Sequence, residues 1–104
     1  MVSKVSDITV KDIADYLRIV ELDDTDTKEL TTFISVAKNY CSSYTGIPIE
    51  SADGESLDDI PDMVIVIYIL CQDMYDNRTM YIEGKINPNK VVQTILDMHT
   101  RNNL

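Results

Sequence analysis

The sequence of 104 residues contains no tryptophan, one phenylalanine and one histidine. A nucleophilic site needs a hydroxyl or thiol, a base and an orienting carboxylate in one place. The single histidine, His99, lies near the C-terminal end, and the sequence offers no matching nucleophile and carboxylate for it. A histidine at this position is expected to be a partly buried or exposed surface residue. We therefore expect no enzymatic activity and no catalytic residue.

Cysteine is also scarce, with two residues, Cys41 and Cys71. Both fall on apolar stripes, where a thiol behaves as a small hydrophobic group, so we expect reduced core residues. A disulfide between them stays open if their helices are antiparallel neighbours, although nothing suggests a secreted scaffold. Two cysteines and one histidine do not supply a zinc site, and Asp24 and Asp26 resemble the start of a calcium loop without its glycine and glutamate. We expect no metal and no cofactor.

Basic residues are outnumbered, because nine Lys and Arg face 18 Asp and Glu, for a net charge of −9. Binding nucleic acid by its phosphates requires clustered cations, and no basic cluster occurs here. The longest apolar run, residues 63–71, is less than half of the roughly 20 residues that span a bilayer. Residues 1–7 are polar and mixed in charge, unlike a signal peptide, and are expected to be flexible. These features predict a soluble intracellular protein that binds no membrane.

Two apolar segments, residues 30–44 and 60–75, have helical spacing. The first has one apolar face: Leu30, Phe33, Ile34, Ala37, Tyr40, Cys41 and Tyr44. The second has one apolar stripe: Ile60, Met63, Val64, Ile67, Leu70, Cys71 and Met74. Further apolar residues lie on its other sides: Ile65, Val66, Tyr68 and Ile69. The second helix is thus expected to be surrounded by other elements. The predicted core is Phe33, Ile34, Ala37, Met63, Val64, Ile67, Leu70, Ile95 and Leu96.

Capping residues mark the ends of four helices. Thr9 and Asp12 fit a capping box that is imperfect because Asp is shorter than the usual Glu. One of the residues 23–26 caps the second helix. Gly46 ends that helix, Pro61 fits the first turn of the third, and Asn87 caps the last. Residues 79–85 are expected to be irregular. The predicted fold is all-α: one domain over residues 1–104, a small four-helix bundle-like unit with a long acidic loop, residues 49–59, between helices 2 and 3.

Three short motifs occur in a characteristic order: Ala37-Lys-Asn-Tyr40, Tyr44-Thr-Gly46 and, after the loop, Tyr75-Asp-Asn-Arg78. In this order the chain resembles the small head-tail connector proteins of tailed phages, also known as head completion or adaptor proteins and linked to DNA packaging. The resemblance covers roughly residues 9–101 and departs from the family at residues 97–101.

This resemblance implies a structural protein that forms a ring beneath the portal, extends the DNA channel and provides the tail attachment platform. Its partners would be other copies of itself, the portal protein and tail-side connectors, with DNA passing through the channel without sequence-specific binding. It would act at the head–tail interface of the virion and assemble in the host cytoplasm. Asp53, Gly54 and Glu55 would face the channel. Met98, Arg101 and Asn102 would form the portal-docking tail.

The outer stripe of the third helix is polar at its ends and apolar in the middle, as in an interface core with a wet rim. It consists of Asp62, Ile65, Ile69, Gln72 and Asp76. As a subunit contact it would suit a head-to-tail ring. Alternatively, the first and last helices simply cover Ile65 and Ile69.

Two other functions remain open. The chain could be a small acidic regulatory or inhibitor protein that binds a basic partner by mimicking the charge of DNA. A mimic should hold its carboxylates on one rigid face, whereas many of those in this chain lie in the predicted loop. A small helical enzyme subunit is the third candidate. Acidity alone is also compatible with ordinary solubility.

Overall fold

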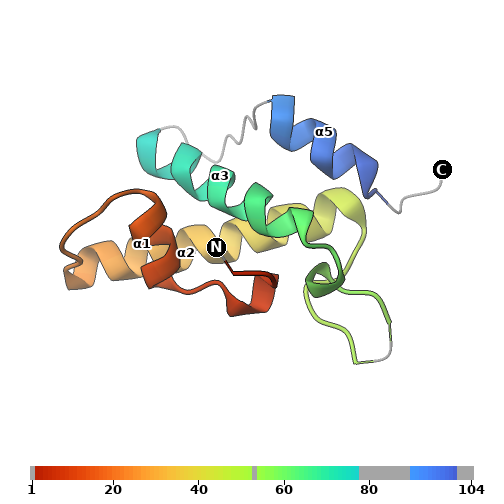
Figure 1. Ribbon diagram of the computed structural model, residues 1–104, viewed down its shortest axis with the longest axis horizontal. Coiled ribbons are helices and arrows are strands. Elements are labelled where there is room, and N and C mark those ends of the chain that lie inside the picture. Colours follow the sequence, from red (N-terminus) through yellow and green to blue (C-terminus); the bar gives the residue numbers. More distant parts are fainter. Residues whose placement is uncertain (1, 53, 78–89, 101–104) are drawn as a thin grey trace.

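The computed structural model describes residues 2–52, 54–77 and 90–100. All regular structure in these ranges is helical, which confirms the all-α prediction. The elements are the 3-10 turns η1 (Val5–Asp7) and η2 (Leu57–Asp59) and the helices α1 (Val10–Tyr16), α2 (Asp24–Thr45), α3 (Asp62–Asp76) and α5 (Lys90–Met98). Helices α2 and α3 run antiparallel, and α1 and α5 each contact both of them (Figure 1).

The helix starts follow from the caps. Thr9 and Asp12 form the capping box: the Asp12 N–H donates to Thr9 Oγ1 at 3.2 Å, and the Thr9 N–H donates to Asp12 Oδ2 at 2.9 Å. Asp23 caps α2 by accepting the Asp26 N–H at 2.7 Å. Helix α2 therefore begins six residues before the apolar stripe, because its polar first turn is held by the cap. Asp24 and Asp26 lie in that turn and are not part of a calcium-binding loop.

Helix α2 ends where the sequence predicts, whereas α3 starts later than predicted. Gly46 has a φ of 78° and donates its N–H to the Ser42 carbonyl at 2.9 Å. The third helix is expected to start near Asp59 or Ile60. Instead Asp59 ends η2, Ile60 has extended backbone angles (φ −122°, ψ 96°), and α3 starts at Asp62. The reason is Pro61, whose ring disfavours helical angles in the residue before it.

Helix α1 ends in a conformation that the sequence does not announce. Arg18 has a φ of 61°, the left-handed region that glycine normally occupies at this position. The Arg18 N–H donates to the Asp15 carbonyl at 3.2 Å, and the Ile19 N–H donates to the Ala14 carbonyl at 2.9 Å. This pair of bonds is a Schellman motif, and it sets the direction of the chain leaving α1.

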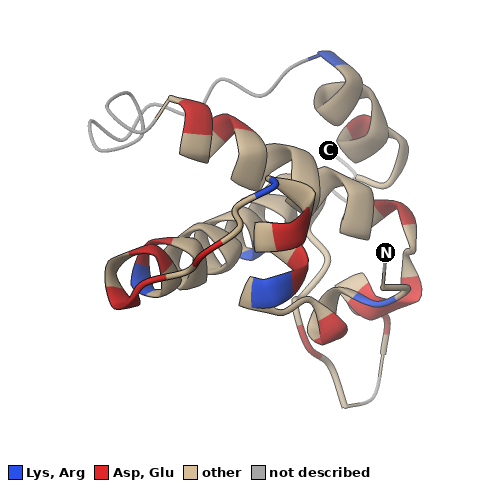
Figure 2. Cartoon of the chain, turned by 60° about the vertical axis from the view of Figure 1, so that its left-hand side comes forward, with Lys and Arg blue, Asp and Glu red and all other residues tan. Residues whose placement is uncertain are grey.

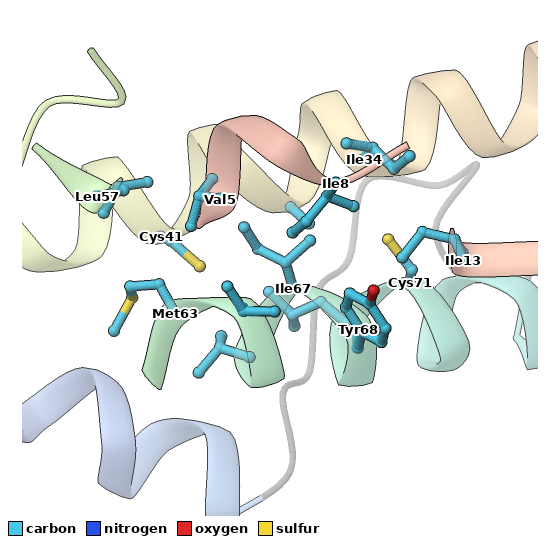
Figure 3. Packing of buried hydrophobic residues seen from close by; sticks show 14 of the residues in the cluster. Val5, Ile8, Ile13, Ile34, Cys41, Leu57, Met63, Ile67, Tyr68 and Cys71 are labelled. Atoms are coloured by element: carbon cyan, nitrogen blue, oxygen red, sulfur yellow. The ribbon is translucent and has the colours of Figure 1, made fainter. Parts of the chain in front are cut away.

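The core lies where α2 and α3 face each other (Figure 3). Of the predicted core, Ile34, Ala37, Met63, Val64, Ile67, Leu70 and Leu96 are buried, whereas Phe33 and Ile95 are only partly buried. Phe33 lies at the edge of the α2 stripe, about 60° from Leu30 on a helix with 3.6 residues per turn. Leu30, fully buried, takes the central position instead.

The core also includes residues that lie outside the four helices. Val5 in η1 is buried, and the Ser6 N–H donates to Asp58 Oδ1 at 2.8 Å, so this turn contacts both the core and η2. Leu57 is buried as well, and its N–H donates to the Pro48 carbonyl at 3.0 Å. The second half of the expected loop is therefore anchored to the core. The predicted irregular segment 79–85 and the Asn87 cap lie outside the described residues.

We expect Arg18→Gly to stabilise the protein by about 0.5–1 kcal/mol, because it removes the steric cost of a side chain at positive φ. Chemical denaturation would measure the difference. Arg18→Ala is the matched control: it keeps the Cβ atom and should give no gain. A loss of stability in the glycine variant would show that the Arg18 side chain stabilises the loop by more than its backbone strain costs.

Truncating the α2 stripe should distinguish its centre from its edge. Leu30→Ala is expected to cost about 2–5 kcal/mol because a fully buried side chain leaves a cavity. Phe33→Ala should cost less than the 3–5 kcal/mol typical of a buried ring, since its ring is partly solvated. Thermal unfolding followed by circular dichroism tests this order, and a larger loss for Phe33→Ala would contradict the packing.

Candidate interaction surface

Helix α3 is covered on most of its circumference. Eight of its residues are buried: Met63, Val64, Val66, Ile67, Tyr68, Leu70, Cys71 and Met74. Tyr68 meets Tyr16 of α1 edge to face, with ring centroids 5.1 Å apart, and α5 packs along α3 as well. The expectation of a surrounded helix is thus met except along one narrow stripe.

That stripe is the predicted one. Asp62, Ile65, Gln72 and Asp76 are exposed, whereas Ile69 is partly buried against the core. Ile65 keeps 43% of its surface in solvent. The neighbouring helices therefore cover Ile69 in part and leave Ile65 open, so the two isoleucines are not equivalent. A change at Ile65 acts mainly on the surface, while a change at Ile69 also reaches the core.

Helix α5 adds apolar surface that the sequence reasoning missed. Val92 and Leu96 are buried, and Ile95 is partly buried. Val91 and Met98 are 59% and 67% exposed, and they share one face of the helix with Ile95 at helical spacing. The signal was present as a second apolar stripe beside the buried one. We call Ile65, Ile69, Val91, Ile95 and Met98 the α3–α5 patch.

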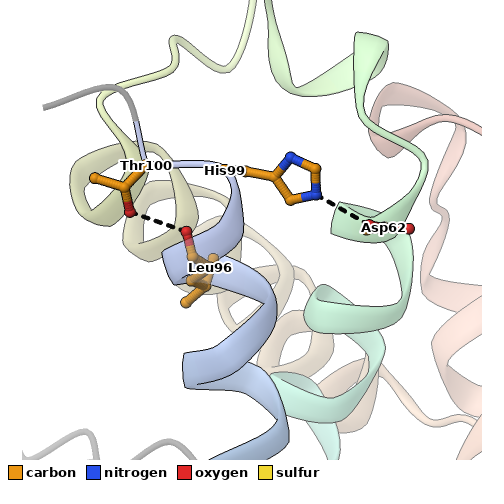
Figure 4. A network of polar contacts seen from close by, with 4 residues as sticks. All are labelled: Asp62, Leu96, His99 and Thr100. Carbon is orange, nitrogen blue, oxygen red and sulfur yellow. Dashed lines mark hydrogen bonds and ion pairs between the residues drawn. The ribbon is translucent and has the colours of Figure 1, made fainter.

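Two polar contacts fasten α5 beside this patch. His99 Nε2 lies 2.9 Å from Asp62 Oδ2 in the first turn of α3, as Figure 4 shows. Since a carboxylate only accepts, the imidazole donates this bond. The Tyr44 hydroxyl of α2 donates to Asp97 Oδ1 at 2.5 Å, and this bond is the main cause that raises the pKa of Tyr44. The lone histidine thus has a structural contact between the end of α5 and the start of α3.

Among the remaining predicted site residues that the structure describes, Met98 belongs to the α3–α5 patch and the loop residues Gly54 and Glu55 do not. Gly54 and Glu55 are exposed on the loop between α2 and η2, which projects on the side of the molecule away from α5 (Figure 1). Met98 is exposed at the last position of α5. Asp53, Arg101 and Asn102 lie outside the described residues. Gly54 and Glu55 therefore lie on a different surface from Met98.

Charge is distributed rather than focused. Acidic side chains occur at the start of α2, around η2 and at both ends of α3, while the basic ones occur singly (Figure 2). Partial burial, and to a smaller extent the neighbouring Asp76, raise the pKa of the Asp73 carboxyl. Within the described ranges, no three His, Cys, Asp or Glu residues stand close enough together to hold a metal ion.

The two thiols are free and buried in the core. Cys41 lies beside Met63 and Val5, whereas Cys71 lies nearer Ile13, farther along α3 (Figure 3). Burial raises the pKa of each thiol from 9.0 to about 12. Both therefore stay protonated and unreactive in the folded protein at neutral pH.

None of the described helices combines the length and apolar character that a membrane span requires. In comparisons with known proteins, no protein-family model, no curated protein and no solved structure matches the chain.

Alkaline pH should destabilise the fold through these thiols. The folded-state pKa is about 12 and the unfolded value about 9, so their contribution is complete below pH 9 and is lost as pH rises toward 12. Chemical denaturation at pH 8 and pH 10.5 would measure the loss. The double variant Cys41→Ala with Cys71→Ala should lose less stability over this interval, while the tyrosine contributions remain common to both proteins. Equal losses would contradict the assigned burial.

Proposed function

We propose that this chain is a structural head-tail connector protein of a tailed phage, which assembles into a ring beneath the portal. The ring would extend the DNA channel and provide the platform for tail attachment. The domain would act as a compact bundle-like unit of helices, with the acidic loop as its channel-facing element. The observation that carries the proposal is the exposed stripe around Ile65 on a helix that is otherwise enclosed.

The stripe supports assembly because it is not needed for the core of the single chain. The opposite side of α3 already packs on α2, with Met63 and Ile67 between the two helices (Figure 3). An apolar residue left in solvent within a polar border has the arrangement of an interface centre and its rim. Asp62, Gln72 and Asp76 supply that border. Removing Ile65 from water would then favour association.

The charge supports passage of DNA rather than its retention. A net charge of −9 repels phosphate, and Lys and Arg are scattered over the described surface. Gly54 and Glu55 are exposed on a loop that leaves the packed helices, which suits a lining that DNA slides past. Sequence-specific binding is not part of this function.

One observation favours the alternative of an acidic protein that binds a basic partner. Asp58 and Asp59 are held by the backbone N–H groups of Ser6 and Ser56, at 2.8 Å and 2.9 Å. Fixed carboxylates are what a charge mimic requires. Such a protein would bind its partner as a monomer, and the binding would weaken steeply with salt.

The sharpest test is assembly. Ile65→Asp should abolish rings and portal association while leaving a helical monomer, because a charge that is harmless on the surface becomes costly in a desolvated interface. Sedimentation at high protein concentration, with and without a co-expressed portal protein, measures assembly, and circular dichroism checks the fold. Adding Ile69→Asp should deepen the effect but also lower stability, since Ile69 is partly buried.

Ser35→Asp is the matched control, because Ser35 is exposed on α2 and adds the same charge away from the patch. The control should assemble like the unchanged protein. A folded Ile65→Asp protein that still forms rings would refute the interface. Absence of rings and of portal association in the unchanged protein would refute the connector function itself.

A further inference from the structure

Helix α5 holds a small share of the core. Of the 21 buried hydrophobic residues in the described ranges, α5 supplies two, Val92 and Leu96, and Ile95 adds a partly buried side chain. The two exposed polar bonds described above, one to α2 and one to α3, also hold it. Helices α1, α2 and α3 and the turn η1 pack on one another directly. The rest of the domain would therefore keep most of its core if α5 left its place.

The connection from α3 to α5 is longer than this arrangement requires. His99, just after α5, meets Asp62 in the first turn of α3, so the two helices run antiparallel (Figure 1). At 1.5 Å per residue α5 is about 13 Å long and α3 about 22 Å, which puts the start of α5 roughly 10–15 Å from the end of α3. Residues 78–89 join these two points, and a stretch of that length can span about 40 Å. The chain is thus long enough to bring α5 to a neighbouring copy.

We propose that α5 is an exchangeable arm, which at high local concentration leaves its own chain and takes the same position on a second copy. The occupied surface is the part of α2 and α3 that α5 covers in the single chain. No new complementary surface is needed, because Val92 and Leu96 would be buried in the same place and Asp97 would meet Tyr44 of the other copy. The inference goes beyond the proposed function, since an exchanged arm can join copies in any assembly of this chain.

The charge of the arm does not oppose exchange. Within residues 90–100 the ionic side chains at neutral pH are Lys90 and Asp97, which cancel. The acidic groups stay on the remainder of each copy, and the chain as a whole has a net charge of −9. Repulsion between two copies therefore disfavours exchange, and salt screens it. Exchange should increase with ionic strength.

The closed monomer, with α5 on its own chain, should prevail in dilute solution. A connection of this length keeps the arm at an effective concentration of roughly 1 mM next to its own binding surface. A second copy competes only when its own concentration approaches that value. An isolated helix of nine residues is marginal in water, so the arm is expected to spend little time unbound. Exchange thus requires concentrated protein or a platform that gathers many copies.

Cross-linking between separately made chains tests the exchange. Tyr44→Cys marks the surface under the arm and Asp97→Cys marks the arm, because these two side chains meet when α5 is in place. The two proteins are mixed at roughly 1 mM, equilibrated and treated with a short bismaleimide, and covalent dimers are measured by denaturing electrophoresis. The native thiols are buried and should not react. Ser35→Cys mixed with Asp97→Cys is the matched control, since Ser35 is exposed on α2 about 13 Å before Tyr44.

A second variant checks that the arm still binds without the Tyr44–Asp97 bond, which both substitutions remove. One chain with Tyr44→Cys and Asp97→Cys, treated at micromolar concentration, should cross-link internally, as mass spectrometry would show. The same chain near 1 mM should also give covalent dimers. Absence of the internal link would contradict the position of α5 and refute the exchange with it.

The mixed Tyr44→Cys and Asp97→Cys proteins should give about tenfold or more covalent dimer than the control pair, because a bound arm raises the local thiol concentration. Equal yields would refute the exchange. The excess should persist when both proteins also carry Ile65→Asp. If Ile65→Asp removes it, the α3–α5 patch brings the thiols together, and the exchange is refuted while the proposed interface is supported. Absence of rings and portal association, with the excess intact, would refute the connector function and leave the exchange standing.

Discussion

The structure depends on the enclosure of α3. This helix is too apolar to lie on a surface, and with eight of the 21 buried hydrophobic residues it supplies the largest share of the described core. Each neighbour covers a different side, so no pair of helices alone would remove enough apolar area from water.

Local polar contacts hold the covering elements in place. Ser6 to Asp58 joins η1 to η2, Tyr44 to Asp97 joins α2 to α5, and His99 to Asp62 joins α5 to α3. Each of these bonds contributes little net free energy to folding by itself, because an exposed group that loses its partner can bond to water instead. Their effect is to select one arrangement among the packings that the apolar stripes allow. They also leave the Ile65 stripe open beside a fixed α5.

That opening connects the packing to function. An apolar helix that is buried on all sides leaves no apolar surface for a partner. One that exposes a wide apolar face promotes aggregation. The observed stripe is narrow and bordered by carboxylates, which favours specific and weak contacts over indiscriminate association. Weak contacts between strongly acidic copies are what the proposed assembly on a platform would require.

The sequence by itself determined the features that depend on neighbours in the chain: the all-helical class, the Thr9 cap, the glycine end of α2, and an enclosed third helix. These rest on local sterics and hydrogen bonds, and on apolar content too high for a surface helix. Tertiary structure decided the rest. The start of α3 is an exception, because the Pro61 ring, a local constraint, moved it. Phe33 fell to the edge of a stripe whose orientation only the partner helices define. Val5 entered the core, and His99 met Asp62, because distant segments converge there. Which isoleucine stays exposed depends on where α1 and α5 lie, and no periodicity within α3 contains that information.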